Sequence, residues 1–444
     1  MVFSRVLPRS HKKHIDLGKT GDNIVLLYKI FSYICTNTIL PVMKTIEKRY
    51  LAPFVLVTLL FLLWGLANNM TDTLLSAFKN IMDMTDAQTS LIQFAFYGSY
   101  FCFALPAALF IRKYSYKSGI ILGLILYSGG ALLFYPASVA ASYTFYLIAI
   151  YILAGGCSIL ETVANPYILA MGAPETATRR LNIAQSFNPL GSISGILLSK
   201  YFILDKLNGN QTDGLSAVTS TYNVLGLCLI AVMIGMLVAK MPAGNDDSRD
   251  SVVDSFKRLI RNKTYIFGVV AQFFYVGAQI GVWSYTIRIV MQELGCDESE
   301  GASWYLATII CFSSARFVFT WLMKYFKPAA LMAVAAAFDI VACCLVVFCG
   351  GMAGVVVAAL IAISFFMSLQ FPTIYGIALE NVGEDSKIGA SGLIMAILGG
   401  ALLTPLQGQV SDMFGINTSY IVPLFCFVVV LCYSLYACQV ASSK

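Results

Sequence analysis

The sequence predicts an all-α integral membrane protein whose twelve transmembrane helices form two pseudo-symmetric six-helix bundles. Three observations lead to this prediction: an apolar composition, twelve long apolar stretches, and a one-sided distribution of basic residues. Of the 444 residues, 58% are hydrophobic and 12% are charged, and the mean hydropathy is +0.77. Soluble domains carry roughly 25% charged residues. A chain this apolar therefore has too few polar residues to cover its surface in water.

The apolar stretches are long enough to cross a bilayer, whose hydrocarbon core is about 30 Å thick. The longest polar connection, residues 241–263, separates six of them from the other six. We therefore predict an N-terminal bundle over 43–240, a cytoplasmic central loop over 241–263 and a C-terminal bundle over 264–444. The predicted spans are 51–77, 89–111, 118–138, 143–169, 180–203, 219–240, 264–290, 302–323, 328–349, 353–379, 387–410 and 419–441.

Residues 1–42 precede the first strong apolar stretch. Val25 to Val42 is moderately apolar, but Lys29 interrupts it and no small-residue cleavage site follows, so a signal peptide is not indicated. We expect Met43 to be the native start of the protein. An interfacial tail and a thirteenth span are the alternatives.

Basic residues define the orientation, because cytoplasmic loops are enriched in Lys and Arg. With twelve spans, one side of the membrane receives the N-terminal tail, the central loop and nearly all other basic residues. Both termini are then cytoplasmic, in a multi-pass protein of the plasma membrane (the bacterial inner membrane). The same distribution assigns the net charge of +6 to topology and gives no reason to expect nucleic acid as a partner. The exceptions among the 29 basic residues are Lys79, Lys200, Lys206, Arg288 and Arg316.

Several other functions are excluded by residue inventory. The only histidines, His11 and His14, lie in the N-terminal tail, so a zinc site or a Ser–His–Asp triad within the membrane is impossible. Most of the 12 cysteines lie in apolar stretches without a CxxC pair, as expected for small hydrophobic residues. The only Gly-Lys-Thr, at 18–20, lacks the first glycine of a phosphate-binding loop. We expect neither an enzyme nor a cofactor or metal.

Charged residues at bilayer depth cost at least about 2.5–3.5 kcal/mol each even on a lenient scale, and four stand out within the predicted spans. They are Asp72, Glu161, Arg316 and Asp339. Asp339 has no polar neighbours at helical spacing, so we expect a largely neutral acid with a packing role. Arg316 could form an ion pair with an acid, which is the structural alternative to a transport role for Asp72 and Glu161.

Polar residues also recur at spacings of three or four, which places them on one face of a helix. Each stripe alone could join helices by hydrogen bonds. Five stripes spread over both halves instead indicate a solute path, and amides beside aromatic rings suit a sugar. The stripes are Asn68, Asn69 and Asp72; Glu161 and Asn165; Asn182, Gln185, Asn188 and Ser192; Gln272, Tyr275, Gln279 and Trp283; and Gln370 and Thr373.

The two carboxyl groups of Asp72 and Glu161 suggest coupling to protons. Removal from water disfavours the charged form of a carboxyl group, so such a group can take up a proton on one side and release it on the other. The predicted substrate-binding residues, taken from the stripes together with the arginine, are Asn69, Asn165, Gln185, Asn188, Gln279, Trp283, Arg316 and Gln370.

Several long motifs resemble the fucose–proton symporters of the major facilitator superfamily. They are Trp64–Asp72, Glu161–Pro166, Arg180–Asn188, Gln272–Tyr285, Arg316–Trp321 and Gln370–Thr373, and the resemblance extends over residues 50 to 440, approximately. It implies two six-helix bundles that rock to give alternating access, and sugar uptake driven by a proton.

Position by position, the resemblance implies that Asp72 and Glu161 are coupling carboxylates and that Asn69, Gln185 and Asn188 face the sugar. Arg316 matches an arginine in the eighth span. The pair Asn68-Asn69 resembles the fucose branch more than the glucose/galactose branch. Asp339 matches no family motif. The loop between spans two and three departs from the superfamily signature and retains only Arg112, Lys113 and Lys117 as its basic cluster.

We therefore expect a monomeric sugar–proton symporter, with L-fucose as the leading substrate and membrane lipid as its surroundings. A glucose/galactose or other hexose symporter is the alternative. A sugar uniporter or exporter of the same fold is a further alternative, which would differ from a symporter in how sugar movement is coupled to protons. A non-transporting sugar receptor would need a signalling domain, which the short central loop and the three residues after 441 do not provide.

Overall fold

The described part of the chain is helical throughout. This computed structural model describes residues 46, 48–81, 86–140, 142–199, 211–241, 251–380 and 382–442, and the side chains of 67–91 lie outside that description. The predicted extension 1–42 lies outside it as well. Residues 45–444 belong to one unit of the structure.

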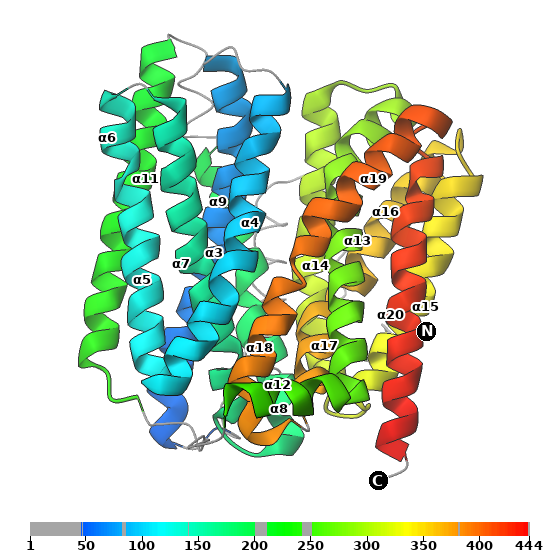
Figure 1. Ribbon diagram of the computed structural model, residues 1–444. Helices are drawn as coiled ribbons and strands as arrows, with labels where there is room; N and C mark the ends of the chain where they lie inside the picture. The colour runs from blue at the N-terminus through cyan, green and yellow to red at the C-terminus, as the bar shows by residue number, and fades with distance from the viewer. Residues whose placement is uncertain are drawn as a thin grey trace, which may run out of the picture. The chain divides into compact units, whose positions relative to one another are not determined.

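Helices of the first half run from blue to green in Figure 1. They are α3 (Lys48–Ile81), α4 (Asp86–Lys113), α5 (Tyr116–Leu132), α6 (Phe134–Val139), α7 (Tyr143–Ala170), η3 (Pro174–Thr176), α8 (Ala177–Gln185), α9 (Phe187–Ser199) and α11 (Gln211–Val238).

Helices of the second half run from green to red in Figure 1. They are α12 (Val252–Arg261), α13 (Lys263–Leu294), α14 (Glu298–Leu322), α15 (Pro328–Phe348), α16 (Ala353–Met367), α17 (Gln370–Leu379), η5 (Gly383–Asp385), α18 (Ser386–Met395), α19 (Leu398–Phe414), η6 (Thr418–Tyr420) and α20 (Ile421–Ser442).

The spans agree with the prediction. Among the described residues, 11 helical segments are long and apolar enough to cross a membrane. The remaining predicted span, 180–203, corresponds to α8 and α9, which have 9 and 13 residues and are each too short to count alone. Helix breaks also divide the third, tenth and eleventh spans, into α5–α6, α16–α17 and α18–α19. The break in the tenth span follows from Pro372, which lacks the N–H that would bond the Ser368 carbonyl, and the other two breaks were not predicted.

Glycines bring the first and fifth helices of each half into backbone contact. A Cβ atom on Gly65 of α3 would lie 2.0 Å from the carbonyl oxygen of Asn188 in α9, and one on Gly191 would lie 1.9 Å from that of Leu62. In the second half, a Cβ atom on Gly399 of α19 would lie 2.0 Å from the carbonyl oxygen of Phe273 in α13. Small residues allow such close approach between membrane helices. The repeated contact supports the pseudo-symmetry of the two bundles.

The central connection contains α12, an additional helix that was not predicted. Its N-terminus is capped by Ser251, whose side chain accepts a hydrogen bond from the Val253 backbone N–H. Helix α12 packs against α13 and α18 and runs across their ends in Figure 1. We call the end of the molecule that carries α12 and the α4–α5 connection the basic end.

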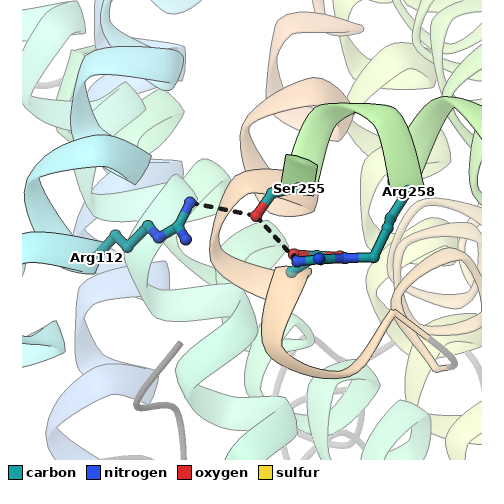
Figure 2. A network of polar contacts seen from close by, with 4 residues as sticks. Arg112, Ser255 and Arg258 are labelled. Atoms are coloured by element: carbon teal, nitrogen blue, oxygen red, sulfur yellow. Dashed lines mark hydrogen bonds and ion pairs between the residues drawn. The ribbon is translucent and has the colours of Figure 1, made fainter. Parts of the chain in front are cut away.

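At the basic end, α12 joins the two halves through a polar network (Figure 2). Arg112 of α4 donates a hydrogen bond to Ser255 Oγ at 3.2 Å, and Arg258 donates to the same oxygen at 3.4 Å. Arg258 also forms a two-pronged ion pair with Asp385, with both N–O distances at 2.8 Å. Lys117 instead donates to the Leu237 and Ala239 carbonyl oxygens at the end of α11. Two residues of the reduced basic cluster, Arg112 and Lys117, are thus used in contacts within the protein.

Candidate functional site

A cavity of about 490 Å³ lies between the two halves. This volume is typical of sites that enclose a small molecule. Its lining on α4, Ile92 to Tyr100, begins in the half of that helix remote from the basic end, and its lining on α14 extends from Tyr305 in the remote half to Arg316 in the nearer half. Contacts of α17 with α8 and of α18 with α4 and α7 join the halves on the basic side of the cavity.

The N-terminal wall of the cavity is polar. Glu161 of α7 is only 1% exposed, yet neither of its carboxyl oxygens has a hydrogen-bond partner among the described residues. Gln185 and Asn188 line the same wall. Gln185 Nε2 donates to Asn165 Oδ1 at 2.8 Å, and Asn188 Nδ2 donates to the Phe61 carbonyl oxygen at 3.3 Å. A buried acid without a protein partner beside oriented amides can bind a proton and a hydroxylated solute.

The C-terminal wall is mainly aromatic. Trp283 of α13 and Phe312 of α14 pack edge to face, with ring centroids 5.0 Å apart, and Tyr305 and Phe371 also line the cavity. The buried indole N–H of Trp283 has no partner in the described part of the chain. This wall therefore offers ring faces to a ligand, together with polar donors such as the Trp283 indole and the Gln279 amide.

Arg316 is the cation of the C-terminal wall, and its guanidinium group is held by backbone carbonyls. Nε donates to the Ser368 carbonyl oxygen at 2.6 Å, and Nη1 donates to the Gln185 carbonyl oxygen of the other half at 3.0 Å. The guanidinium carbon lies 4.6 Å from the Phe312 ring centroid. The structure therefore does not show the ion pair between Arg316 and Glu161 that was the structural alternative to a transport role for this acid.

The predicted site residues fall into three groups. Glu161, Gln185, Asn188, Gln279, Trp283 and Arg316 line the cavity. Asn165 lies behind Gln185, and Gln370 points away to bond Asp339. The side chains of Asn69 and Asp72 lie outside the described residues, although the backbone of α3 continues through both positions.

Apart from Trp283, the aromatic residues of the cavity were not predicted as site residues. Tyr97, Tyr100, Tyr305, Phe312 and Phe371 all line it. Each lies in an apolar stretch in which an aromatic residue gives no contrast, so only the fold distinguishes a lining ring from one that faces lipid.

Comparison with known proteins places this architecture in a family. The model of the Major Facilitator Superfamily matches residues 55–405. The chain belongs to this superfamily. Its membership confirms the predicted fold class, and the predicted resemblance is confirmed by two curated relatives.

Within the superfamily, the chain is similar to two L-fucose-proton symporters. It is 42% identical to that of Haemophilus influenzae, with 89% of this chain and 99% of the relative covered. It is 37% identical to that of Escherichia coli, with 89% and 95% covered. A glucose/galactose transporter of Brucella abortus is 30% identical, with 90% and 98% covered.

Solved structures of the superfamily agree. FucP, crystallised in the outward conformation, superposes with a TM-score of 0.81 at 36% identity, covering 88% of this chain and 99% of FucP. The human organic anion transporter MFSD10 has a TM-score of 0.70 at 12% identity and shares the fold alone.

Proposed function

We propose that this protein is a secondary active transporter that takes up a monosaccharide together with a proton by alternating access, with L-fucose as the substrate. The observation that carries the proposal is Glu161. It is a buried carboxyl group whose two oxygens accept no hydrogen bond from the described residues, and it lines a cavity between two bundles. The two relatives at 42% and 37% identity are L-fucose-proton symporters, which supports the same conclusion.

In this proposal Asp72 and Glu161 bind the transported proton. Asn69, Gln185, Asn188, Gln279 and Trp283 contact the sugar, because hydroxyl groups need paired donors and acceptors and a sugar ring needs an apolar face. Asn165 and Gln370 act from behind this layer, since their polar atoms hold other protein groups. Arg316 lines the cavity itself, and its Nη1 holds the Gln185 carbonyl oxygen of the other half.

We further propose that the basic end is cytoplasmic, in the inner membrane of a bacterium, and that both termini lie on that side. The cavity then faces outward, and contacts of the basic side close its floor. Sugar and proton together would favour the state that opens inward, because coupling resides in the difference between the affinities of the two states.

Uptake into vesicles tests the proposal. The purified protein is reconstituted, a pH gradient acid outside is imposed, and labelled L-fucose is followed. We expect accumulation above the external concentration, and its collapse when an uncoupler removes the gradient. Accumulation that is insensitive to the uncoupler would refute proton coupling.

A glucose/galactose transporter is the second candidate, favoured by the relative at 30% identity. A competition screen of fucose, galactose, glucose and arabinose against labelled fucose separates the two. Stronger competition by glucose or galactose than by fucose would assign the chain to the second candidate.

A further inference from the structure

Asp339 is a buried acid for which the transport cycle proposed above has no role. It lies on α15 in the stripe Met332, Ala335, Ala336, Ala342 and Cys343, which is otherwise small or apolar, and it is 0% exposed. Its partner is Gln370 of α17, whose Nε2 donates a hydrogen bond to Asp339 Oδ2. The pair lies behind the wall of the cavity, since neither residue lines it.

Gln370 occupies a special position because it begins α17, immediately after the break in the tenth span. Helix α16 ends at Met367, so Ser368 and Leu369 lie between the two helices. The break frees backbone carbonyls inside the membrane, where each needs a partner. Tyr275 Oη donates to the Met367 carbonyl oxygen at 3.0 Å, and Arg316 Nε donates to that of Ser368.

The same break contributes to the closure of the cavity floor. Arg316, which is bound to Ser368 and 4% exposed, donates to the Gln185 carbonyl oxygen, where α8 ends in the opposite half. Close by, Asn182 Nδ2 donates to Thr373 Oγ1 at 3.3 Å, again across the halves. Two helix breaks, one in each bundle, are therefore joined through one guanidinium group.

Asp339 and Gln370 can form two hydrogen bonds with each other that do not require a change of protonation during transport. Two atoms of the pair, Asp339 Oδ1 and Gln370 Oε1, lack partners among the described residues. A neutral carboxyl group donating from Oδ1 to Gln370 Oε1 would satisfy both atoms at once, as an acid pairs with an amide. An asparagine at 339 offers the same donor and acceptor in the same shape.

We propose that Asp339 is a positioning residue that holds Gln370, and with it the α16–α17 break, so that Arg316 keeps its contact with Gln185 and the floor of the cavity stays closed. The proposal rests on the proposed function only for its transport readout. Loss of the pair would loosen the floor, reduce the population that faces outward and lower the apparent affinity for external sugar.

The test compares Asp339→Asn, Asp339→Leu and Gln370→Leu in reconstituted vesicles. We expect Asp339→Asn to retain the wild-type half-saturation concentration for L-fucose and the wild-type pH profile. Asp339→Leu and Gln370→Leu should each raise the half-saturation concentration by about 2-fold to 10-fold, the range for one lost hydrogen bond, with the pH profile unchanged. The double variant should add nothing to either single variant, because both remove the same interaction.

A second readout needs no sugar. Spin labels introduced through a non-natural amino acid at Tyr114 and Phe326, which are 59% and 56% exposed at the basic ends of the two halves, report their separation. We expect Asp339→Leu to shift the distribution to longer distances and Asp339→Asn to leave it unchanged. If the wild type fails to accumulate fucose, the proposed function fails, and this measurement still decides the role of Asp339.

Met332→Leu is the matched control, because Met332 is buried in the same stripe of α15 and the change conserves volume. It should affect neither readout. An Asp339→Asn variant that no longer accumulates sugar, or that has a shifted pH profile, would overturn the proposal in favour of a proton-carrying acid. If the leucine variants kept the wild-type affinity for L-fucose and the wild-type distances between the spin labels, Asp339 would have only a packing role. If Asp339→Leu cannot be purified, Gln370→Leu is judged by the same outcomes.

Discussion

The two walls of the central cavity differ in chemistry. The N-terminal wall presents the buried carboxyl group of Glu161 and the amides of Gln185 and Asn188, whereas the C-terminal wall presents Trp283 and other rings. The cation of the C-terminal wall is held by carbonyl oxygens of both halves. The difference indicates a division of labour, in which one wall binds the proton and the sugar hydroxyls and the other stacks on the sugar and supports the closed floor.

The largest expected effect comes from Glu161→Gln, which keeps the shape of the side chain but cannot carry a proton. We expect the variant to lose accumulation of L-fucose against its gradient while still exchanging fucose across the membrane. Accumulation in an imposed pH gradient and exchange at equal pH are measured on the same vesicles. Accumulation at the wild-type level would show that Glu161 of the N-terminal wall does not carry the transported proton.

A matched pair of glutamines compares the two walls directly. Gln185→Ala removes a lining amide and leaves Asn165 Oδ1 without its partner, which costs about 1–3 kcal/mol for a buried group. Gln279→Ala removes an amide from the half-buried C-terminal wall and should cost less, about 0.5–1 kcal/mol. Fucose affinity measured by calorimetry should therefore fall more in Gln185→Ala. Equal losses would contradict the division between the walls.

Much of this arrangement could be predicted from the sequence, because a charge or amide in an apolar stretch stands out. Glu161, Gln185, Asn188 and Arg316 were predicted for this reason. The break at Ser368 is marked in the sequence by Pro372, which has no N–H to bond the carbonyl four residues before it. The groups that bind the freed carbonyls could not be predicted, since Tyr275 and Arg316 come from other helices.

The pairing of Asp339 with Gln370 was missed for a related reason. The two residues lie on different helices, so no spacing along the chain connects them, and helical periodicity assigned Gln370 to the substrate path. The pair becomes visible only when α15 and α17 are packed together.

Trp283→Ala tests the stacking role of the C-terminal wall. Loss of the ring should weaken fucose binding by about 1–1.5 kcal/mol, or roughly tenfold, because an aromatic contact is lost with its buried area. Trp283→Phe keeps a ring face and should recover most of the affinity. The dependence of uptake on the pH gradient should be unchanged in both variants. A change in that dependence would show that the C-terminal wall also takes part in proton coupling.

The smallest effect is expected at the basic end, where the halves meet outside the cavity. Ser255→Ala removes the hydroxyl that accepts from Arg112 of one half and from Arg258, which pairs with Asp385 of the other. Lys257→Ala on the same helix is the control, because its ion pair with Asp254 stays within α12.

Polar contacts near the surface contribute at most about 1 kcal/mol and weaken with salt, so Ser255→Ala should raise the half-saturation concentration by no more than about fivefold. The hydrogen bond from Arg316 to the Gln185 carbonyl oxygen is buried, so salt does not screen it in this way. If Ser255→Ala raised the half-saturation concentration as much as Asp339→Leu does, the principal contact between the halves would lie at the basic end and not at the cavity floor. The difference between the two walls would then concern ligand binding only, and the C-terminal wall would have no part in stabilising the closed floor.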